Sequence, residues 1–214
     1  QTLNEALSEV QQRQLAAYMV MLAHWNSTFN LTALRDASEM LSHHLSDCLR
    51  VLAPLLRHLH TAGLLGRETP PRLLDVGSGG GLPGVVLAIC CPQVQVTCVD
   101  TVGKKAAFIR QVAAELRLPN LKAEHARVEQ LQGRYELITS RAFASLPDFV
   151  KLTRSLLSEG AVWMAMKGKA PDEELAELPA DVAVFHVEPL QVPGLEAERC
   201  LVWMRPEGEA QGVA

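Results

Sequence analysis

The feature of this sequence with the clearest chemistry is a glycine-rich run that follows a carboxylate. Asp75 lies in a short apolar run, 72–76, and the glycines after it are Gly77, Gly79, Gly80, Gly81 and Gly84. Without side chains, glycines let a ligand approach the backbone, and a helix that begins after them presents N–H groups to it. A second apolar run ends at Asp100, at a spacing typical of a carboxylate that accepts from ribose hydroxyls. The pattern predicts a strand, a turn and a helix that bind a nucleotide-like cofactor.

Two cofactors fit this pattern. The spacing G-x-G-x-x-G that ends at Gly84 matches the dinucleotide fingerprint, whereas D-x-G-x-G-x-G from Asp75 matches sites for S-adenosylmethionine (SAM). Asp75 favours SAM, because a carboxylate there repels an anionic pyrophosphate and attracts the amino and sulfonium cations of SAM. A NAD-dependent oxidoreductase and a glycine turn without a ligand remain as alternatives.

The predicted cofactor site draws on three segments that follow three strands. The carboxylate of Asp100 can accept hydrogen bonds from a ribose and can also cap the N-terminus of the next helix. The segment 126–129, after the third strand, has the position expected for contacts around an adenine. The expected cofactor contacts are Asp75, Gly77, Gly79, Gly81 and Asp100, together with the segment 126–129.

Alternating strand and helix patterns must position these segments. Strands are predicted at 72–76, 94–99, 137–139, 161–166, 182–187 and 200–204, and helices at 83–91 and 104–116. Because strands that alternate with helices form parallel sheets, we expect an α/β fold. Its sheet should be mostly parallel, with helices on both faces and an antiparallel pair at the end.

The first seventy residues are predicted to be helical. Apolar residues recur at helical spacing over 3–25, a loop is expected at 26–35, and a capping box at Asp36 and Glu39 begins another helix. Glycines and prolines at 63–71 end this part. We therefore expect a helical subdomain at 1–70, a cofactor-binding domain at 71–206 and a flexible tail at 207–214.

The overall charge conceals two regions of opposite sign. The 214 residues have a net charge of −4, which argues against a protein that binds nucleic acid over its whole surface. Residues 101–127 nevertheless carry an excess of +4, and residues 170–189 contain six acidic side chains and no Lys or Arg. Lys104 and Lys105 begin the basic segment, which suits local contact with phosphates.

Cysteines, apolar runs and histidines set further limits. The five cysteines form no C-x-x-C pair, so we expect reduced thiols in a cytosolic protein. The longest apolar stretch, near 82–91, is too short to span a membrane, and no signal peptide is expected. His44 and Asp47 are interpreted as a packing pair, and no metal site is expected.

Methyl-transfer chemistry would leave recognisable residues, and two such sets are missing from the expected places. The fourth strand ends in Ser140-Arg141-Ala142-Phe143, without the Asn/Asp-Pro-Pro-aromatic element that orients an exocyclic amine. The cysteines lie within apolar runs, which is unsuited to a nucleophile that attacks a pyrimidine. N7 of guanine needs no base, because its lone pair is unprotonated at neutral pH. Oxygen and small-molecule acceptors remain possible by the same argument.

Motifs along nearly the whole chain resemble a known family. They are Trp25-Asn26-x-x-x-Asn30-Leu31-Thr32 with Arg35-Asp36, His44-x-x-Asp47, the run 73–84, Asp100-x-x-x-Lys104-Lys105, Arg127-Val128-Glu129, Ser140-Arg141-Ala142-Phe143-Ala144, Lys167-Gly168 and Glu198-Arg199. The family that they resemble is the bacterial 16S (small-subunit) rRNA guanine-N7 methyltransferases, RsmG, also called glucose-inhibited division protein B.

The resemblance implies a fold, a cofactor and a product. The fold would be that of a class I SAM-dependent methyltransferase, a Rossmann-like, mostly parallel seven-stranded sheet with an N-terminal helical extension. The product would be 7-methylguanosine in small-subunit rRNA, and a non-catalytic SAM-binding module is the alternative. The residues implied to contact SAM are Gly77, Leu82, Val128, Glu129 and Arg141, with Asp100 at the ribose.

The resemblance also implies a partner, which would be small-subunit rRNA or the assembling small ribosomal subunit. We expect a cytoplasmic monomer with no DNA or membrane partner. Arg141 and Arg127 should orient phosphate, guanine or the SAM carboxylate, with no obligatory base. Residues in the loop 26–35 would either cover the methyl-transfer pocket or cap helices. The expected substrate contacts are Asn30, Thr32, Arg35, Lys104, Lys105, Lys167 and Arg199.

Overall fold

The computed structural model describes residues 7–29, 44–169, 171–190 and 198–208. Its first helix, α1 (Glu9–Phe29), confirms the predicted N-terminal helix but ends later than expected. The loop predicted from residue 26 is therefore wrong for residues 26–29. Trp25 packs 5.3 Å from the Phe108 ring, and Asn26 is buried, so packing against the rest of the protein continues the helix. The predicted capping box at Asp36 and Glu39 lies outside the described residues.

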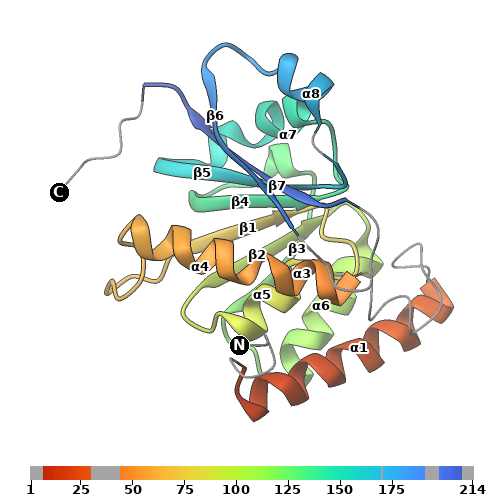
Figure 1. Ribbon diagram of the computed structural model, residues 1–214. Helices are drawn as coiled ribbons and strands as arrows, with labels where there is room; N and C mark the ends of the chain where they lie inside the picture. The colour runs from red at the N-terminus through yellow and green to blue at the C-terminus, as the bar shows by residue number, and fades with distance from the viewer. Residues whose placement is uncertain (1–6, 30–43, 170, 191–197, 209–214) are drawn as a thin grey trace.

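A seven-stranded sheet forms the centre of the molecule (Figure 1). In spatial order its strands are β3 (Leu121–His125), β2 (Gln95–Asp100), β1 (Arg72–Val76), β4 (Tyr135–Arg141), β5 (Leu157–Lys167), β7 (Cys200–Pro206) and β6 (Val182–Pro189). Neighbours from β3 to β5 pair in parallel, whereas β7 is antiparallel to both β5 and β6. The predicted sheet and its antiparallel end are confirmed.

Helices cover both faces of the sheet, unequally. One face carries α3 (Ser46–Arg50), α4 (Leu52–Thr61), α5 (Gly84–Cys90) and α6 (Gly103–Glu115), with α1 lying across α5 and α6 (Figure 1). The other face is covered by α7 (Leu146–Thr153) and the short 3₁₀ turns at 128–130 and 154–156, with α8 (Asp172–Ala176) beside α7. Each face has its own apolar layer, as a parallel sheet requires.

The N-terminal helices share one hydrophobic core with the sheet. Tyr18 and Leu22 of α1 are fully buried in the same cluster as Leu73 of β1 and Phe108 of α6. Trp163 and Trp203 are buried as well. The N-terminal segment is thus positioned by packing and can contribute side chains to a site at the sheet edge.

The five cysteines are free thiols, as expected, and four of them are buried. Burial raises the pKa of the Cys48 thiol to about 12 and that of Cys98 well above its usual range. Thiols of this kind are poor nucleophiles at neutral pH. Of the helices that the structure describes, none is long and apolar enough to cross a membrane.

Candidate active site

The carboxyl ends of β1 and β4 define the place where a ligand would bind. These strands are neighbours, and the strand order runs outward from them in both directions, to β2 and β3 on one side and to β5 on the other. Open parallel sheets bind ligands outside the carboxyl ends of the strands at such a reversal point. The glycine run follows β1, and Arg141 and Ala142 lie where β4 ends.

The glycine run forms a tight turn whose backbone conformation strongly favours glycine. Gly77, Gly79 and Gly81 have φ values of +66°, +57° and +96°, in the left-handed region that side chains disfavour. A Cβ at Gly77 would lie 2.6 Å from Cδ2 of Phe143, so the turn and the segment after β4 approach each other closely. Gly77 N also donates to Val99 O of β2 at 2.9 Å.

Asp75 lies beneath this turn. Its side chain is fully buried, and Oδ2 accepts a hydrogen bond from the Gly84 N–H at 2.8 Å, which ties β1 to the start of α5. Oδ1 is buried without a hydrogen-bond partner among the described residues. Burial raises the pKa of this carboxyl to about 7, although the Gly84 hydrogen bond and the Arg141 charge act in the opposite direction. The structure therefore places Asp75 as a support of the turn, and contact with SAM stays a prediction.

A cavity of about 230 Å³ opens beside the turn. Its lining residues are Val76, Gly77, Val99, Asp100, Thr101, Val102, Lys105, Ala126, Val128, Ala142 and Phe143. Most of them come from the segments at the ends of β1, β2 and β3, which the sequence predicted for a cofactor, and Ala142 and Phe143 come from the segment after β4. We call this space the cofactor cavity.

Asp100 has two roles in the cofactor cavity. Its Oδ2 accepts from the Gly79 N–H at 3.0 Å, and its Oδ1 accepts from the Val102 N–H at 2.9 Å. A carboxylate has about four acceptor positions, so two backbone bonds leave capacity for a ribose diol. The same side chain thus fixes the glycine turn and the start of α6 and presents acceptors to a ligand.

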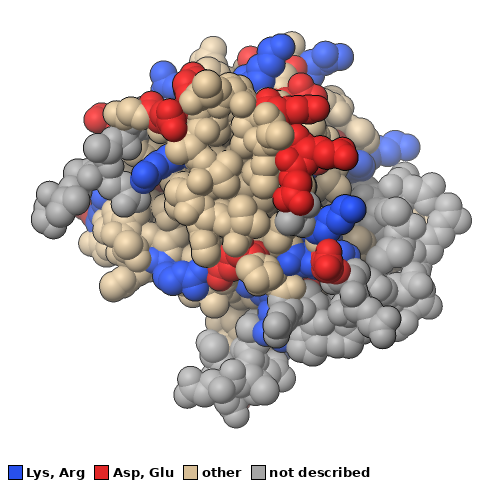
Figure 2. Space-filling model, turned by 45° about the horizontal axis from the view of Figure 1, so that its top comes forward, with Lys and Arg blue, Asp and Glu red and all other residues tan. Residues whose placement is uncertain are grey.

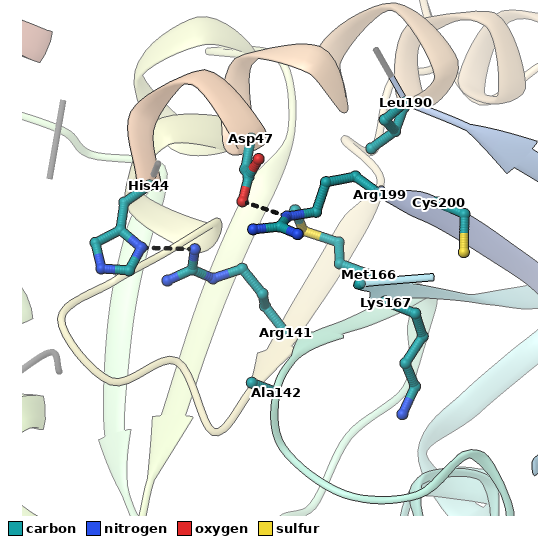
Figure 3. A pocket seen from close by; sticks show the side chains of 10 residues that line it. His44, Asp47, Arg141, Ala142, Met166, Lys167, Leu190, Arg199 and Cys200 are labelled. Carbon is teal, nitrogen blue, oxygen red and sulfur yellow. Dashed lines mark hydrogen bonds and ion pairs between the residues drawn. The ribbon is translucent and has the colours of Figure 1, made fainter. Parts of the chain in front are cut away.

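A second cavity, of about 380 Å³, also has Ala142 in its lining (Figure 3). Its lining residues are His44, Asp47, Arg141, Ala142, Met166, Lys167, Gly168, Leu190, Arg199 and Cys200. Ala142 lines both cavities and has a φ of +54°, an unusual conformation for alanine. Strained backbone of this kind often marks a functional site. We call this space the acceptor pocket.

Two arginines in the acceptor pocket are held by the segment that leads into α3. His44 Nδ1 lies 2.9 Å from Arg141 Nη1, and Arg199 Nε donates to Asp47 Oδ2 at 3.0 Å (Figure 3). His44 and Asp47 are three residues apart, so they project from the same side of a helical turn. The N-terminal part of the chain therefore closes this pocket and orients both guanidinium groups.

Lys167, at the end of β5, contributes a third cation. Its Nζ donates to Ala144 O at 3.0 Å and forms an ion pair with Glu174 Oε2 at 2.8 Å. Burial alone would raise the pKa of Glu174, but hydrogen bonds from Lys167 and from Leu146 N–H lower it overall. Lys167 is therefore partly neutralised by Glu174 of α8, as Arg199 is by Asp47.

The structure brings together many of the predicted site residues, but not all. Among the expected cofactor contacts, Gly77, Asp100 and Val128 line the cofactor cavity, and Arg141 lines the acceptor pocket. Of the expected substrate contacts, Lys167 and Arg199 line the acceptor pocket, whereas Lys105 lines the cofactor cavity. Arg127, Glu129 and Lys104 are exposed beside these spaces. Asn30, Thr32 and Arg35 lie outside the described residues.

Sequence reasoning missed three contributors to the site. His44 and Asp47 were interpreted as a packing pair, although their spacing already placed them on one helix face. Tyr18 of α1 is fully buried, and its hydroxyl donates to Gly80 O at 2.8 Å. No local pattern indicates that Tyr18 reaches a turn sixty-two residues later in the chain. Within the part of the chain that the structure describes, no three His, Cys, Asp or Glu side chains are grouped to hold a metal ion.

The residues present fit SAM. Gly77 of the tight turn lines the cavity with its backbone, Asp100 presents acceptors suited to ribose hydroxyls, and Ala126 and Val128 offer apolar contact for an adenine. With the seven-stranded sheet, these features define the class I SAM-dependent methyltransferases. The SAM prediction is confirmed, and the dinucleotide alternative is set aside.

Comparisons with known proteins give the same class and a family. The family model GidB, described as rRNA small subunit methyltransferase G, matches residues 11–202. Ribosomal RNA small subunit methyltransferase G of Leptothrix cholodnii is 61% identical over 211 residues, which cover 98% of this chain and 94% of the relative. The protein of the same name from Polaromonas naphthalenivorans is 60% identical over 200 residues, covering 94% and 89%. The chain belongs to this family of rRNA small subunit methyltransferase G, which confirms the resemblance seen in the sequence.

Solved structures with low sequence identity share the fold. A ribosomal protein L11 methylase from Lactobacillus delbrueckii subsp. bulgaricus matches with a TM-score of 0.54 and 14% identity, covering 74% of this chain and 77% of that one. The glycopeptide N-methyltransferase MtfA complexed with SAM matches with a TM-score of 0.53 and 12% identity, covering 69% and 91%. These likenesses support the class I fold alone.

Proposed function

We propose that this protein transfers the methyl group of SAM to N7 of a guanine in small-subunit rRNA. The observation that carries the proposal is the pair of adjoining cavities, which share Ala142 as a wall. A cofactor in the first cavity would present its reactive end to the second. Membership of the family of rRNA small subunit methyltransferase G supports rRNA as the acceptor.

Residues of the cofactor cavity would hold SAM by contacts of different kinds. The turn at Gly77 admits it close to the backbone, Asp100 accepts from its ribose, and Val128 contacts its adenine. When bound, SAM supplies an electrophilic methyl group, whose carbon–sulfur bond breaks as the N7 lone pair attacks the carbon. Arg141, held by His44, orients the groups that meet at Ala142. Alignment of this kind accounts for a large part of many rate enhancements.

The transfer to N7 asks no side chain to remove a proton. N7 carries a lone pair and no hydrogen, so the base gains a positive charge and loses nothing in the methyl transfer itself. The acceptor pocket is consistent with this requirement, since the titratable side chains Asp47 and His44 are engaged with Arg199 and Arg141. The proposed role of these residues is to position the base and the cofactor.

The charge distribution supports a local contact with RNA. Acidic side chains gather on the face shown in Figure 2, toward the side on which α8 lies in Figure 1. Asp172, Glu173 and Glu177 are exposed there, and they would repel phosphates. The basic segment that begins with Lys104 and Lys105 lies beside the cofactor cavity instead. We infer that the RNA approaches over that segment and avoids α8.

One chain forms both cavities, which supports a monomeric enzyme. An rRNA acceptor would place it with the assembling ribosome in the cytoplasm, without a DNA or membrane partner. Light scattering of the purified protein should give the mass of a single chain.

The test of the proposal is methyl incorporation. The protein is incubated with tritiated SAM and, separately, naked small-subunit rRNA, assembled small subunits, duplex DNA and small metabolites, and the products are digested to nucleosides. We expect labelled 7-methylguanosine from one of the rRNA substrates alone. Binding of SAM without transfer to any substrate would identify a non-catalytic module, and label in another nucleoside would contradict N7 as the acceptor atom.

A further inference from the structure

The carboxylate of Asp47 in the acceptor pocket has hydrogen-bonding capacity that the protein does not use. Asp47 lines the pocket and is 4% exposed, and its Oδ2 accepts from Arg199 Nε at 3.0 Å. Its Oδ1 is buried without a hydrogen-bond partner among the described residues. A buried acceptor without a donor costs free energy. An acceptor of this kind in a cavity therefore suits a ligand that brings donors.

Methyl transfer to N7 limits how a guanine can be recognised. The commonest contact of arginine with guanine is bidentate, to O6 and N7. That contact is excluded during the reaction, because the N7 lone pair must point at the methyl carbon. The opposite edge of the base stays accessible during the reaction, and it carries the N1–H and N2–H donors. Donors on that edge require acceptors from the protein.

Asp47 lies where that edge would be. In the view of Figure 3, Ala142 and the Asp47–Arg199 pair lie at opposite sides of the pocket, with Arg141 between them. A base with N7 toward Ala142, the wall shared with the cofactor cavity, turns its donor edge toward Asp47. Met166 and Leu190 supply apolar contacts for its faces, and a volume of about 380 Å³ is typical of small-molecule sites. Enzymes that modify bases commonly bind them flipped out of the RNA in such pockets.

We propose that Asp47 is the residue that selects guanine, by accepting hydrogen bonds from its N1–H and N2–H groups while Arg199 holds the carboxylate in place. This inference rests on the proposed function and names the protein group that recognises the acceptor. Adenine is rejected, because it presents an acceptor at N1 and no amino group at C2. The carboxylate also stabilises the positive charge that the base gains as the N7–methyl bond forms.

The experiment removes the proposed hydrogen bond in two ways, by changing the base and by changing the protein. Once the modified nucleotide has been mapped, small-subunit rRNA is prepared with inosine at that position, because inosine lacks only the 2-amino group and retains N7. Single-turnover methyl transfer is measured on both substrates with the wild-type protein, with Asp47→Asn, and with Asp148→Asn as the matched control. Asp148 is exposed in the first turn of α7, away from both cavities.

The wild-type protein should methylate inosine about tenfold to a hundredfold more slowly than guanosine, the fold-change of one charge-assisted hydrogen bond. Asp47→Asn should slow transfer to guanosine by a similar factor. It should methylate the two bases at rates that differ less than about threefold, because removing the second partner of a contact costs little once the first is gone. Asp148→Asn should keep the wild-type ratio. Calorimetry should show that Asp47→Asn binds SAM within about twofold of the wild-type affinity, because Asp47 does not line the cofactor cavity.

Equal wild-type rates on inosine and guanosine would overturn the inference, and so would full discrimination by Asp47→Asn. Asp47 would then serve only to hold Arg199. If Asp47→Asn does not fold, the comparison of the two bases with the wild-type protein decides by itself. Failure of the proposed function has a different signature, since the wild-type protein would then form no 7-methylguanosine in rRNA.

Discussion

The cofactor cavity and the acceptor pocket share a wall but are built in different ways. The cofactor cavity is lined by short segments at or just after the ends of strands, and mostly by apolar residues. The acceptor pocket is lined by charged side chains from distant parts of the chain. Its Arg141–His44 contact joins residues 97 positions apart, and its Arg199–Asp47 contact joins residues 152 positions apart.

This difference follows from what each site must recognise. A cofactor common to a whole class of enzymes can be bound by the geometry of one turn and one carboxylate. An acceptor that distinguishes one enzyme from another needs a specific set of donors and acceptors, and several elements must supply them. Variants should therefore affect cofactor binding in one region and transfer in the other.

Arg141→Ala should have the largest effect and should separate the two regions most clearly. Removing a positioning cation beside the reacting atoms is expected to lower the single-turnover rate about a hundredfold to a thousandfold. The free energy of unfolding, measured with urea, should change far less, because Arg141 is only partly buried. The single-turnover rate of Arg141→Lys should lie between those of the wild-type protein and Arg141→Ala. Wild-type turnover in Arg141→Ala would contradict a role in transfer.

Gly77→Ala should disable the cofactor cavity. Its φ of +66° costs an alanine about 1–2 kcal/mol, and its Cβ would collide with Phe143. Gly63→Ala is the matched control, because Gly63 has a φ of +60° with nothing within 4 Å of an added Cβ. Calorimetry should show that Gly77→Ala loses SAM affinity and Gly63→Ala retains it, although both unfold more easily. Equal SAM affinity in the two variants would mean that the turn does not contact SAM.

Asp75→Asn should alter the pH dependence of stability. The pKa of Asp75 is raised from 3.8 to about 7 by burial, so the folded protein keeps a proton that the unfolded chain releases. Stability is then fully present below about pH 4 and falls by a few kcal/mol as pH rises to about 7. Asparagine can still accept from the Gly84 N–H and should remove most of this fall. The free energy of unfolding of both proteins is measured with urea at about pH 4.5 and 7.5, without SAM. If it falls by the same amount between these pH values in Asp75→Asn as in the wild-type protein, Asp75 is not the cause of the fall.

Tyr18→Phe should test whether the N-terminal helix supports the cofactor cavity. The variant removes the hydroxyl that donates to Gly80 O, and the loss of this hydrogen bond costs about 1 kcal/mol. If the whole cost falls on the SAM-binding conformation of the glycine turn, SAM affinity drops roughly fivefold. Tyr135→Phe is the control, because Tyr135 begins β4 and so lies at the end of that strand away from the cofactor cavity. Unchanged SAM affinity in Tyr18→Phe would show that the turn keeps its shape without this bond.

Lys104→Ala and Lys105→Ala should have the smallest effects and should differ from each other. Lys104 is exposed, so its loss should weaken rRNA binding a few-fold and lower the salt slope by about one. Lys105 lines the cofactor cavity, so its loss should lower SAM affinity as well. Filter binding of rRNA at several salt concentrations, with calorimetry of SAM, separates the two. Identical behaviour of the two variants would contradict this division.

The sequence by itself determined the α/β class, the mostly parallel sheet and the cofactor turn. These features depend on local patterns, such as apolar runs of strand length, the glycines at 77, 79 and 81 and the carboxylate at Asp100, and each of them can be recognised within a few residues. Element ends were less certain, as the continuation of α1 to Phe29 shows, because they depend on packing against distant side chains.

Only the tertiary structure decided how the acceptor pocket is assembled. His44 and Asp47 looked like a packing pair in the sequence, since nothing local indicates that Arg141 and Arg199 lie against them. Lys105 likewise belongs to the cofactor cavity and not simply to a basic surface. Asp75 proved to be a buried support of the turn. The contacts of Arg141 with His44 and of Arg199 with Asp47 join residues far apart in the chain, and they exist only once the N-terminal part packs on the sheet.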